Sequence, residues 1–291
     1  MAVRLFRSTD ASAPALSNSN AGSLITILRA CLVEGFGTRT SAGWTMPFSD
    51  LPNNKAAFQS VSGDCIQIDD NSDYRWASAL GFKTMSALDT GTEQYPNSDQ
   101  VGAGNEYRVY KRYSSDVSTS NWAVIASDNW FYFINHQKTT SPSYPAGFFF
   151  GDYDCVNPSF TENNILTGYL VSQTDTSATL AHSSLYTSQP WFARRNYQSA
   201  ILPEVLRLHI NALAWDSPNP FTGSLDMEKV YLRSENSPYV RYGSLPNHFR
   251  MLGSNNLGYR GGELFDIAGD KYIVLAYTSS AFAVKYDIDI G

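Results

Sequence analysis

The sequence predicts a mainly β protein with two β-rich, sandwich-like halves and one short amphipathic helix near the N-terminus that packs on a sheet. Three observations lead to this fold class. Charged residues make up 16% of the chain and aromatic residues 14%, and aromatic side chains favour strands. Short apolar or alternating runs follow one another, separated by turns rich in Gly, Pro, Asn, Asp and Ser. One early segment has the apolar period of a helix.

The chain has 291 residues, which is long enough for one large or two medium domains. We expect an N-terminal arm over residues 1–22, rich in Ser, Thr, Ala and Asn, and then a β-rich domain over residues 23–157. A second β-rich domain is expected over residues 158–291, because the polar stretch 156–164, with Pro158, disfavours a strand there. No internal repeat of fixed period is visible.

Residues 3–6, VRLF, alternate and predict a first strand. Residues 24–34, within SLITILRACLVEGFG, predict the helix, because apolar side chains recur three and four residues apart. Ser23 is the expected N-cap, and Gly35 stands where a glycine commonly ends a helix. The helix needs apolar surface to cover, which the predicted sheets supply. Its apolar face is formed by Leu24, Ile25, Leu28, Cys31 and Leu32 and is widened by Ile27.

The rest of the chain predicts strands joined by turns. SDN, at residues 127–129, lies between two apolar runs and predicts a hairpin. KTTSPSYP, at residues 138–145, predicts a loop, and residues 203–215 fit either a helix or a strand, of which we favour the strand. The other predicted strands lie within residues 65–70, 107–113, 122–126, 130–135, 147–154, 165–171, 178–186, 228–233, 258–277 and 281–288.

The charge and the cysteines exclude several classes of protein. The formal net charge is −6, whereas a nucleic-acid binder needs a basic stripe, and the arginines at 194–195, 241, 250 and 260 are expected to be solvated. The three cysteines, Cys31, Cys65 and Cys155, are widely spaced and predict buried, reduced thiols rather than disulfides or a zinc site. The N-terminus lacks the apolar region of a signal peptide, and no run is long enough to span a membrane.

No motif predicts catalytic, cofactor-binding or metal-binding residues. Gly35-Phe36-Gly37 follows a helix, whereas a dinucleotide fingerprint precedes one. The four histidines, at 136, 182, 209 and 248, lack the spacing of a metal pair. No pair of carboxylates is nominated as a glycosidase pair, because sequence spacing does not report distance in space.

One acidic stretch resembles the start of a calcium loop, through Asp69, Asn71 and Asp73. The sixth position of that loop is Tyr74 instead of Gly, and the twelfth is Leu80 instead of Glu. A polar turn is therefore the favoured interpretation, with an irregular Ca²⁺ site as the alternative.

Three aromatic clusters stand out, WFYF (130–133), FFF (148–150) and PWF (190–192). Such side chains form cores or subunit interfaces, and exposed ones also stack on sugar rings. We favour the core or interface.

The opening residues, RLFRSTDASAP, then GSL, a helix, a Gly-Phe-Gly turn and AGWTMPF, resemble a widespread family of tailed-bacteriophage virion proteins. Members of that family have a similar order of motifs, with a GYG-like turn and with Lys where this chain has Met46. The match is poorest over residues 165–240. Later blocks that resemble the family lie at 54–59, 80–96, 131–135 and 148–158 and, more loosely, at 243–277.

The resemblance implies a non-enzymatic structural subunit of the virion that binds copies of itself and other virion proteins and needs no cofactor. A tail or baseplate position is favoured; the alternatives are a capsid decoration or neck protein, or a receptor-recognition module that binds host glycan. A glycan-degrading enzyme carried by the particle is a further hypothesis, which no motif supports. The protein would be synthesised in the host cytoplasm. Residues 1–22 are expected to extend the sheet of a neighbouring subunit, so a chain without residues 2–20 should fold but not be incorporated.

Overall fold

A computed structural model shows a mostly β chain with one helical segment near the N-terminus, α1 (Ser23–Leu28) continued by η1 (Arg29–Glu34). The predicted fold class is therefore confirmed. The structure describes residues 2–17, 21–71, 76–95, 108–111, 121–136, 146–155, 164–170, 191–194, 206–209, 228–229, 231–234, 241–244, 246, 248–251, 262–267, 269–276 and 281–287.

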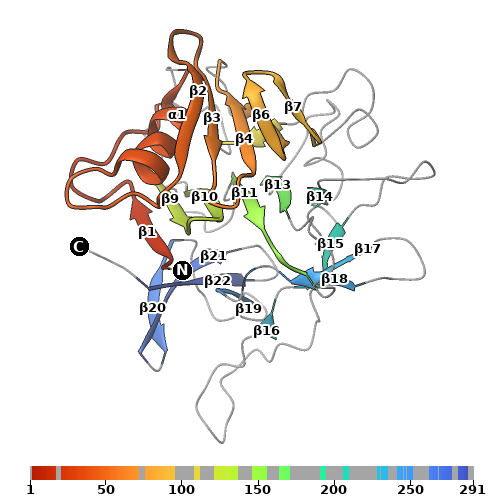
Figure 1. The fold of residues 1–291 in the computed structure, drawn as a ribbon. Coiled ribbons are helices and arrows are strands. Elements are labelled where there is room, and N and C mark those ends of the chain that lie inside the picture. The colour runs from red at the N-terminus through yellow and green to blue at the C-terminus, as the bar shows by residue number, and fades with distance from the viewer. Residues whose placement is uncertain are drawn as a thin grey trace, which may run out of the picture.

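The largest sheet has ten antiparallel strands and begins with the N-terminal strand (Figure 1). Its central strands β9, β10 and β11 pair in sequence, and the SDN turn joins the first two as the predicted hairpin. In spatial order the strands are β1 (Arg4–Arg7), β9 (Asn121–Ala126), β10 (Trp130–His136), β11 (Ala146–Asp152), β13 (Asn164–Leu170), β14 (Trp191–Arg194), β15 (Leu206–His209), β17 (Tyr231–Ser234), β18 (Arg241–Ser244) and β12 (Asp154–Cys155).

A second, five-stranded sheet is built mainly from the chain that follows the helix. A short 3₁₀ helix, η2 (Leu51–Asn53), joins its first two strands, and the two-stranded hairpin β6 (Thr84–Ala87) and β7 (Thr90–Thr92) follows β5. The spatial order is β2 (Thr45–Asp50), β3 (Lys55–Gln59), β4 (Cys65–Asp69), β5 (Trp76–Phe82) and β8 (Arg108–Tyr110).

The C-terminal residues form a third sheet, also antiparallel. Its hairpin β21–β22 pairs over six residues, and Ile273 and Val284 lie opposite each other and are buried. The spatial order is β16 (Glu228–Lys229), β19 (Phe249–Met251), β22 (Ala281–Tyr286), β21 (Asp270–Ala276) and β20 (Leu264–Ile267).

The sheet β2–β3–β4–β5–β8 and the β1 end of the large sheet face each other across the main core (Figure 1). Alternate residues of each strand point into it, as period-2 geometry requires. Phe131 and Phe133 of β10 meet Phe148 and Phe150 of β11 there. From the opposite sheet, Phe58, Ile66, Ile68, Ala77 and Ala79 belong to the same core.

The other face of the large sheet is also buried around Ile125, Ile134 and Phe149. The C-terminal sheet reaches this side, since the ring of His248, next to β19, lies 5.9 Å from the ring of Trp130. Asp287, just after β22, makes two hydrogen bonds with Val3, just before β1: its Oδ2 accepts the N–H of Val3, and its own N–H donates to the carbonyl of Val3. Around β9, β10 and β11 the large sheet therefore lies between the sheet β2–β3–β4–β5–β8 and the C-terminal sheet. Burial on both faces accounts for the continuous apolar runs of the hairpin strands.

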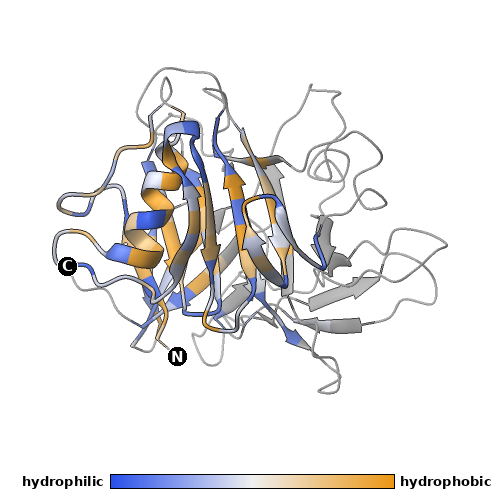
Figure 2. Cartoon of the chain, turned by 45° about the horizontal axis from the view of Figure 1, so that its top comes forward, coloured by the Kyte–Doolittle hydropathy of each residue, from blue (hydrophilic) through white to orange (hydrophobic). Residues whose placement is uncertain are grey.

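The helix closes the gap between the two sheets that form the main core. Every residue of its predicted apolar face is buried, and Figure 2 shows hydrophobic residues along it and on the strands beside it. Its second half is a π-helix rather than the α-helix predicted. The N–H groups of Ala42, Gly43 and Trp44 donate to the carbonyls of Cys31 and Leu32, so the incoming β2 segment binds backbone groups of the widened turn.

Gly35 ends the helix, as predicted. Its φ of 82° lies in the left-handed region, and a Cβ there would lie 2.4 Å from the carbonyl oxygen of Arg39. Both facts exclude a larger residue.

The first strand, β1, is part of this chain's own core instead of a free arm. Leu5 and Phe6 are buried, and β1 pairs with β9. Its outer edge is closed at both ends, because Val3 exchanges hydrogen bonds with Asp287, and the N–H and C=O of Arg7 are bound by Asp10. Removing residues 2–20 would take this strand out of the core, so we revise the expectation that the shortened chain folds.

Of the other sequence-based predictions, several strands are confirmed and others lie outside the described residues. The strands predicted at 65–70, 122–126, 130–135 and 281–288 are present as β4, β9, β10 and β22, and β15 is a strand within residues 203–215. The loop at 138–145 and the strand at 178–186 lie outside the described residues. The domain boundary at 157/158 stays a prediction; β11 and β13, on either side of it, are paired in one sheet.

Trp44 joins the two sheets and generates a first prediction. Its buried ring packs edge-on against Phe131, and its Nε1–H donates to the carbonyl of Ser127 at 2.7 Å. Trp44→Phe keeps an aromatic ring but leaves that buried carbonyl without its donor, so we expect the free energy of unfolding to fall by about 1–3 kcal/mol in urea titrations. Val61→Ala, at a side chain that is 67% exposed, should change it by less than about 0.5 kcal/mol. Equal stability of Trp44→Phe and the parent chain would contradict this role.

Candidate functional site

The most buried pair of opposite charges in the described residues is Asp70 with Lys111. Asp70 directly follows β4, and Lys111 directly follows β8. Both strands run antiparallel to β5, which lies between them, so both end at the same edge of the sheet. The side chains are 0% and 1% exposed, and Lys111 Nζ contacts Asp70 Oδ1.

Asp70 also holds the N-terminus of the helix. Its Oδ2 accepts the N–H of Leu24 at 2.9 Å, and its carbonyl accepts the N–H of Gly22. Its own N–H donates to the carbonyl of Asn54, just before β3. The prediction of Ser23 as the N-cap is therefore wrong, since Ser23 Oγ donates to the carbonyl of Ser17 and the capping carboxylate comes from a distant strand.

Burial raises the pKa of Asp70 above its ordinary value, while Lys111 and the backbone N–H donors oppose that rise. The carboxyl group consequently takes up a proton more readily than an exposed Asp. An amine and a carboxyl group thus meet in a space closed to water, with one carboxyl oxygen bound by a backbone N–H.

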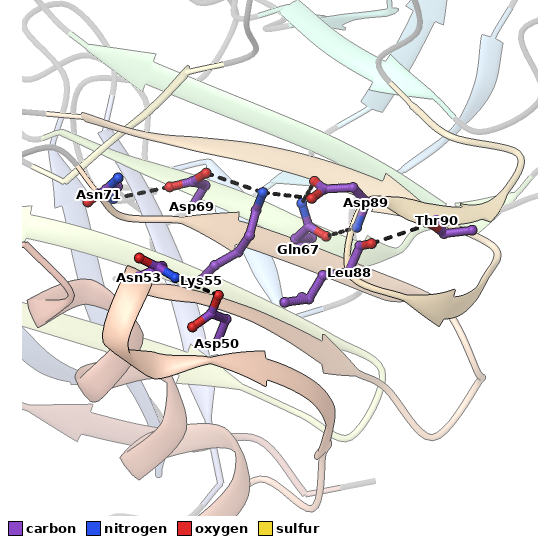
Figure 3. Close-up of polar contacts among 9 residues, drawn as sticks. All are labelled: Asp50, Asn53, Lys55, Gln67, Asp69, Asn71, Leu88, Asp89 and Thr90. Carbon is purple, nitrogen blue, oxygen red and sulfur yellow. Dashed lines mark hydrogen bonds and ion pairs between the residues drawn. The ribbon is translucent and has the colours of Figure 1, made fainter.

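A second, exposed network lies on the outer face of the same sheet (Figure 3). The Nζ of Lys55 lies 2.9 Å from the carboxylate of Asp89 and 3.4 Å from that of Asp69. Gln67, on β4, donates its side-chain N–H to Asp89 and accepts the backbone N–H of Asp89. These contacts attach the turn of the β6–β7 hairpin to strands β3 and β4.

The charges of this network shift each other's pKa. The hydrogen bond from Lys55 lowers the pKa of Asp89 below its ordinary value, against some burial and with help from Gln67. Partial burial disfavours the charged form of Lys55, but its contacts with Asp89 and Asp69 exceed that effect and raise its pKa. Both groups are therefore ionised near neutral pH.

The calcium-like stretch is a polar turn where the structure describes it. Asp69 accepts the N–H of Asn71 at 3.2 Å and faces Lys55, and Asp73 lies outside the described residues. Among the residues described, no group of three or more His, Cys, Asp or Glu side chains is placed to hold a metal ion.

A third ionic cluster links the N-terminal motif RLFRSTDASAP to the turn that follows the helix. Arg39, almost fully buried, donates to Asp10 Oδ1 at 2.8 Å, and Arg7 Nε lies 3.4 Å from the same oxygen. Asp10 belongs to the RSTDASAP motif, so this motif is used to hold β1 against the segment that follows the helix.

A cavity of about 320 Å³ lies over the exposed side of the helix. Its lining includes the ion pair of Arg29 with Glu34 and the exposed side chain of Leu51. The remaining lining residues are Gly22, Ile25, Thr26, Ala30 and Asn54. Among these, Thr26 Oγ1 donates to the carbonyl of Gly22 at 3.0 Å.

The predicted aromatic clusters are core residues where the structure describes them. All residues of 130–133 and 148–150 are buried, which confirms the favoured interpretation and leaves these side chains closed to a sugar. The side chains of 190–192 lie outside the described residues, as do those of the histidines at 136, 182 and 209. Cys31 and Cys65 are buried free thiols, and burial raises the pKa of each.

Sequence analysis did not single out Asp70 or Lys111, although a signal was present. Ile66 and Ile68 point into the core, and Asp70 continues that alternate register. Val109 and Lys111 repeat the pattern at the end of β8. Asp70 and Lys111 carry opposite charges, and both continue the inward register of strands that end at the same edge of the sheet. Once the strand order is known, this pattern indicates a buried ion pair.

Comparison with protein-family models and with curated protein sequences finds no match for this chain. Within the described part of the chain, no helix has the length and apolar character needed to cross a membrane.

The buried pair generates a second prediction. Asp70→Ala leaves Lys111 without its carboxylate and removes the acceptor from the N–H of Leu24. We expect the free energy of unfolding to fall by about 3–5 kcal/mol in urea titrations, which is the usual cost of breaking a buried ion pair. Asp69→Ala, at the adjacent and more exposed carboxylate, is the matched control and should cost less than about 1 kcal/mol. Similar losses in both variants would refute the central role of Asp70.

The exposed network generates a third prediction, on pH. Because the pKa of Asp89 is lower in the folded chain than in the unfolded chain, its stabilising contribution is present above the unfolded pKa of about 3.9. This contribution is lost as pH falls through the lower, folded pKa. Asp89→Asn should therefore flatten the acid limb of a plot of unfolding free energy against pH, by well under 1 kcal/mol because the side chain is exposed. The same acid limb in Asp89→Asn and in the parent chain would contradict this assignment.

Proposed function

We propose that this chain is a non-enzymatic structural subunit of a tailed-bacteriophage virion, placed in the tail or baseplate and assembled as a symmetric oligomer. The observation that carries the proposal is where the family-like N-terminal motif lies. Leu5, Phe6, Asp10, Gly35 and Trp44 are all used for packing, pairing and turns. A motif used in this way specifies a scaffold, which supports a structural role such as that of the virion proteins whose sequences it resembles.

Three ion pairs among the described residues support the same function. Asp10 binds Arg39, Asp70 binds Lys111, and Asp89 binds Lys55. Each of these carboxylates joins two segments that are distant in sequence. Their contacts therefore serve the cohesion of the fold, which a particle component needs.

The surface through which copies would bind each other is not the described aromatic clusters, because their side chains fill this chain's own core. The low charge of the chain, 16% of residues, supports an assembly role in another way, since interface cores are depleted of charge. Capsid decoration and neck positions suit the same kind of subunit. Two of the three aromatic clusters that suggested the glycan-binding alternative are buried, so they offer no surface to a sugar.

The test is a search for the chain in mature particles. Antibodies against the recombinant full-length chain should label purified particles of the phage that encodes it at one position, and quantitative mass spectrometry should give a fixed copy number. A host cytoplasmic protein of similar abundance, followed through the same purification, controls for carry-over. Light scattering of the purified chain should show an oligomer. A monomer that is absent from particles and turns over a substrate would overturn the proposal.

A further inference from the structure

The buried contact between Asp70 and Lys111 brings together the two groups from which an amide forms. The carboxyl group and the ε-amine are almost completely withdrawn from solvent, and the Nζ and Oδ1 atoms are in direct contact. They are 41 positions apart in sequence, but β4 and β8 end at the same edge of the sheet and hold them together. The sheet supplies this proximity whatever the function of the protein.

We propose that Asp70 and Lys111 become joined by an intramolecular isopeptide bond. Within the pair, a proton passes from the Lys111 ammonium to the Asp70 carboxylate, which leaves a neutral amine and a neutral acid. The Nζ lone pair attacks Cγ, and a bond from Cγ to Nζ forms. A proton then moves from Nζ to the Oδ1 hydroxyl, the bond from Cγ to Oδ1 breaks, and one water molecule leaves. Nothing is oxidised or reduced, and no further reactant is consumed.

Three features of the site favour this reaction over a lasting ion pair. Burial raises the pKa of Asp70, so the neutral carboxyl group that Nζ attacks is more accessible here than at a surface. Held in one place, two such groups behave as if present at very high concentration, on the order of 10⁵ M or more for well-oriented pairs. The N–H of Leu24 donates to Oδ2, the oxygen on which negative charge develops when Nζ attacks.

The product fits the same surroundings. The amide keeps Oδ2 as an acceptor for Leu24 and replaces two buried charges by one N–H and one C=O, which are cheaper to bury. It also ties β4 to β8 across β5, as a covalent cross-link between strands that do not pair with each other. Such a cross-link restricts the unfolded chain as a disulfide does, and it survives in a reducing compartment.

The exposed Lys55–Asp89 contact offers an internal comparison. It has similar chemistry and a hydrogen bond of 2.9 Å, but Asp89 is 60% exposed. Water solvates the carboxylate of Asp89 there, so the ion pair is stable and no amide is expected. Burial therefore distinguishes the two pairs.

The test is the intact mass of the full recombinant chain, measured under denaturing conditions after it has folded. We expect a mass lower than that of the sequence by one water molecule. Tryptic digestion should then give a branched peptide in which residues 56–75 are joined to residues 109–112, because trypsin does not cleave after a modified Lys111. The fragmentation spectrum should place the link at Asp70 and Lys111.

Two variants give matched controls. Lys111→Arg keeps a cation beside Asp70 but has no reactive amine, so its mass should equal that of its sequence. Lys55→Arg alters the exposed pair and should still show the loss of one water. Because the parent chain's mass decides the question alone, failure of Lys111→Arg to fold does not weaken the test. A folded parent chain with the full sequence mass, or a water loss located elsewhere, would overturn the proposal.

Discussion

The structure depends on satisfying the polar groups of Asp70, where three parts of the fold meet without access to water. Its carboxylate binds the helix N-terminus and Lys111, its carbonyl binds Gly22, and its N–H binds Asn54. An unpaired polar group at this depth costs several kcal/mol. The helix, the start of β3 and the end of β8 are consequently held in one arrangement, and the apolar face of the helix is directed into the gap between the two sheets.

The aromatic residues then fill the space that this junction defines. The hairpin β9–β10 and strand β11 present Phe side chains to the main core and a second apolar set to the opposite face. A sheet buried on both faces uses its aromatic residues internally. The contacts with other subunits that we propose would therefore need other parts of the surface, and low charge is a more useful guide to them than aromatic content.

As the particle component that we propose, the chain would have to withstand stress as well as bind its neighbours. The free edge of β1 is closed by Asp287 and Asp10, which limits unwanted pairing of strands between chains. Ionic contacts attach the helix, the hairpin and the N-terminal motif to the sheets. A covalent link between Asp70 and Lys111 would extend the same principle, because it joins two strands that share no backbone hydrogen bonds.

The sequence by itself determined the features that arise from neighbouring residues. Period-2 alternation determined β4 and β22, and the apolar runs on either side of the SDN turn determined β9 and β10. The 3.6-residue period determined the helix and its buried face, and the φ available to Gly35 determined where the helix ends. Only the tertiary structure decided that Asp70 caps the helix instead of Ser23, that the second half is π-helical, and that Lys111 is the partner of Asp70. The physical reason is that each of these depends on a hydrogen-bond or charge partner brought close by strand order, and the sequence does not state strand order.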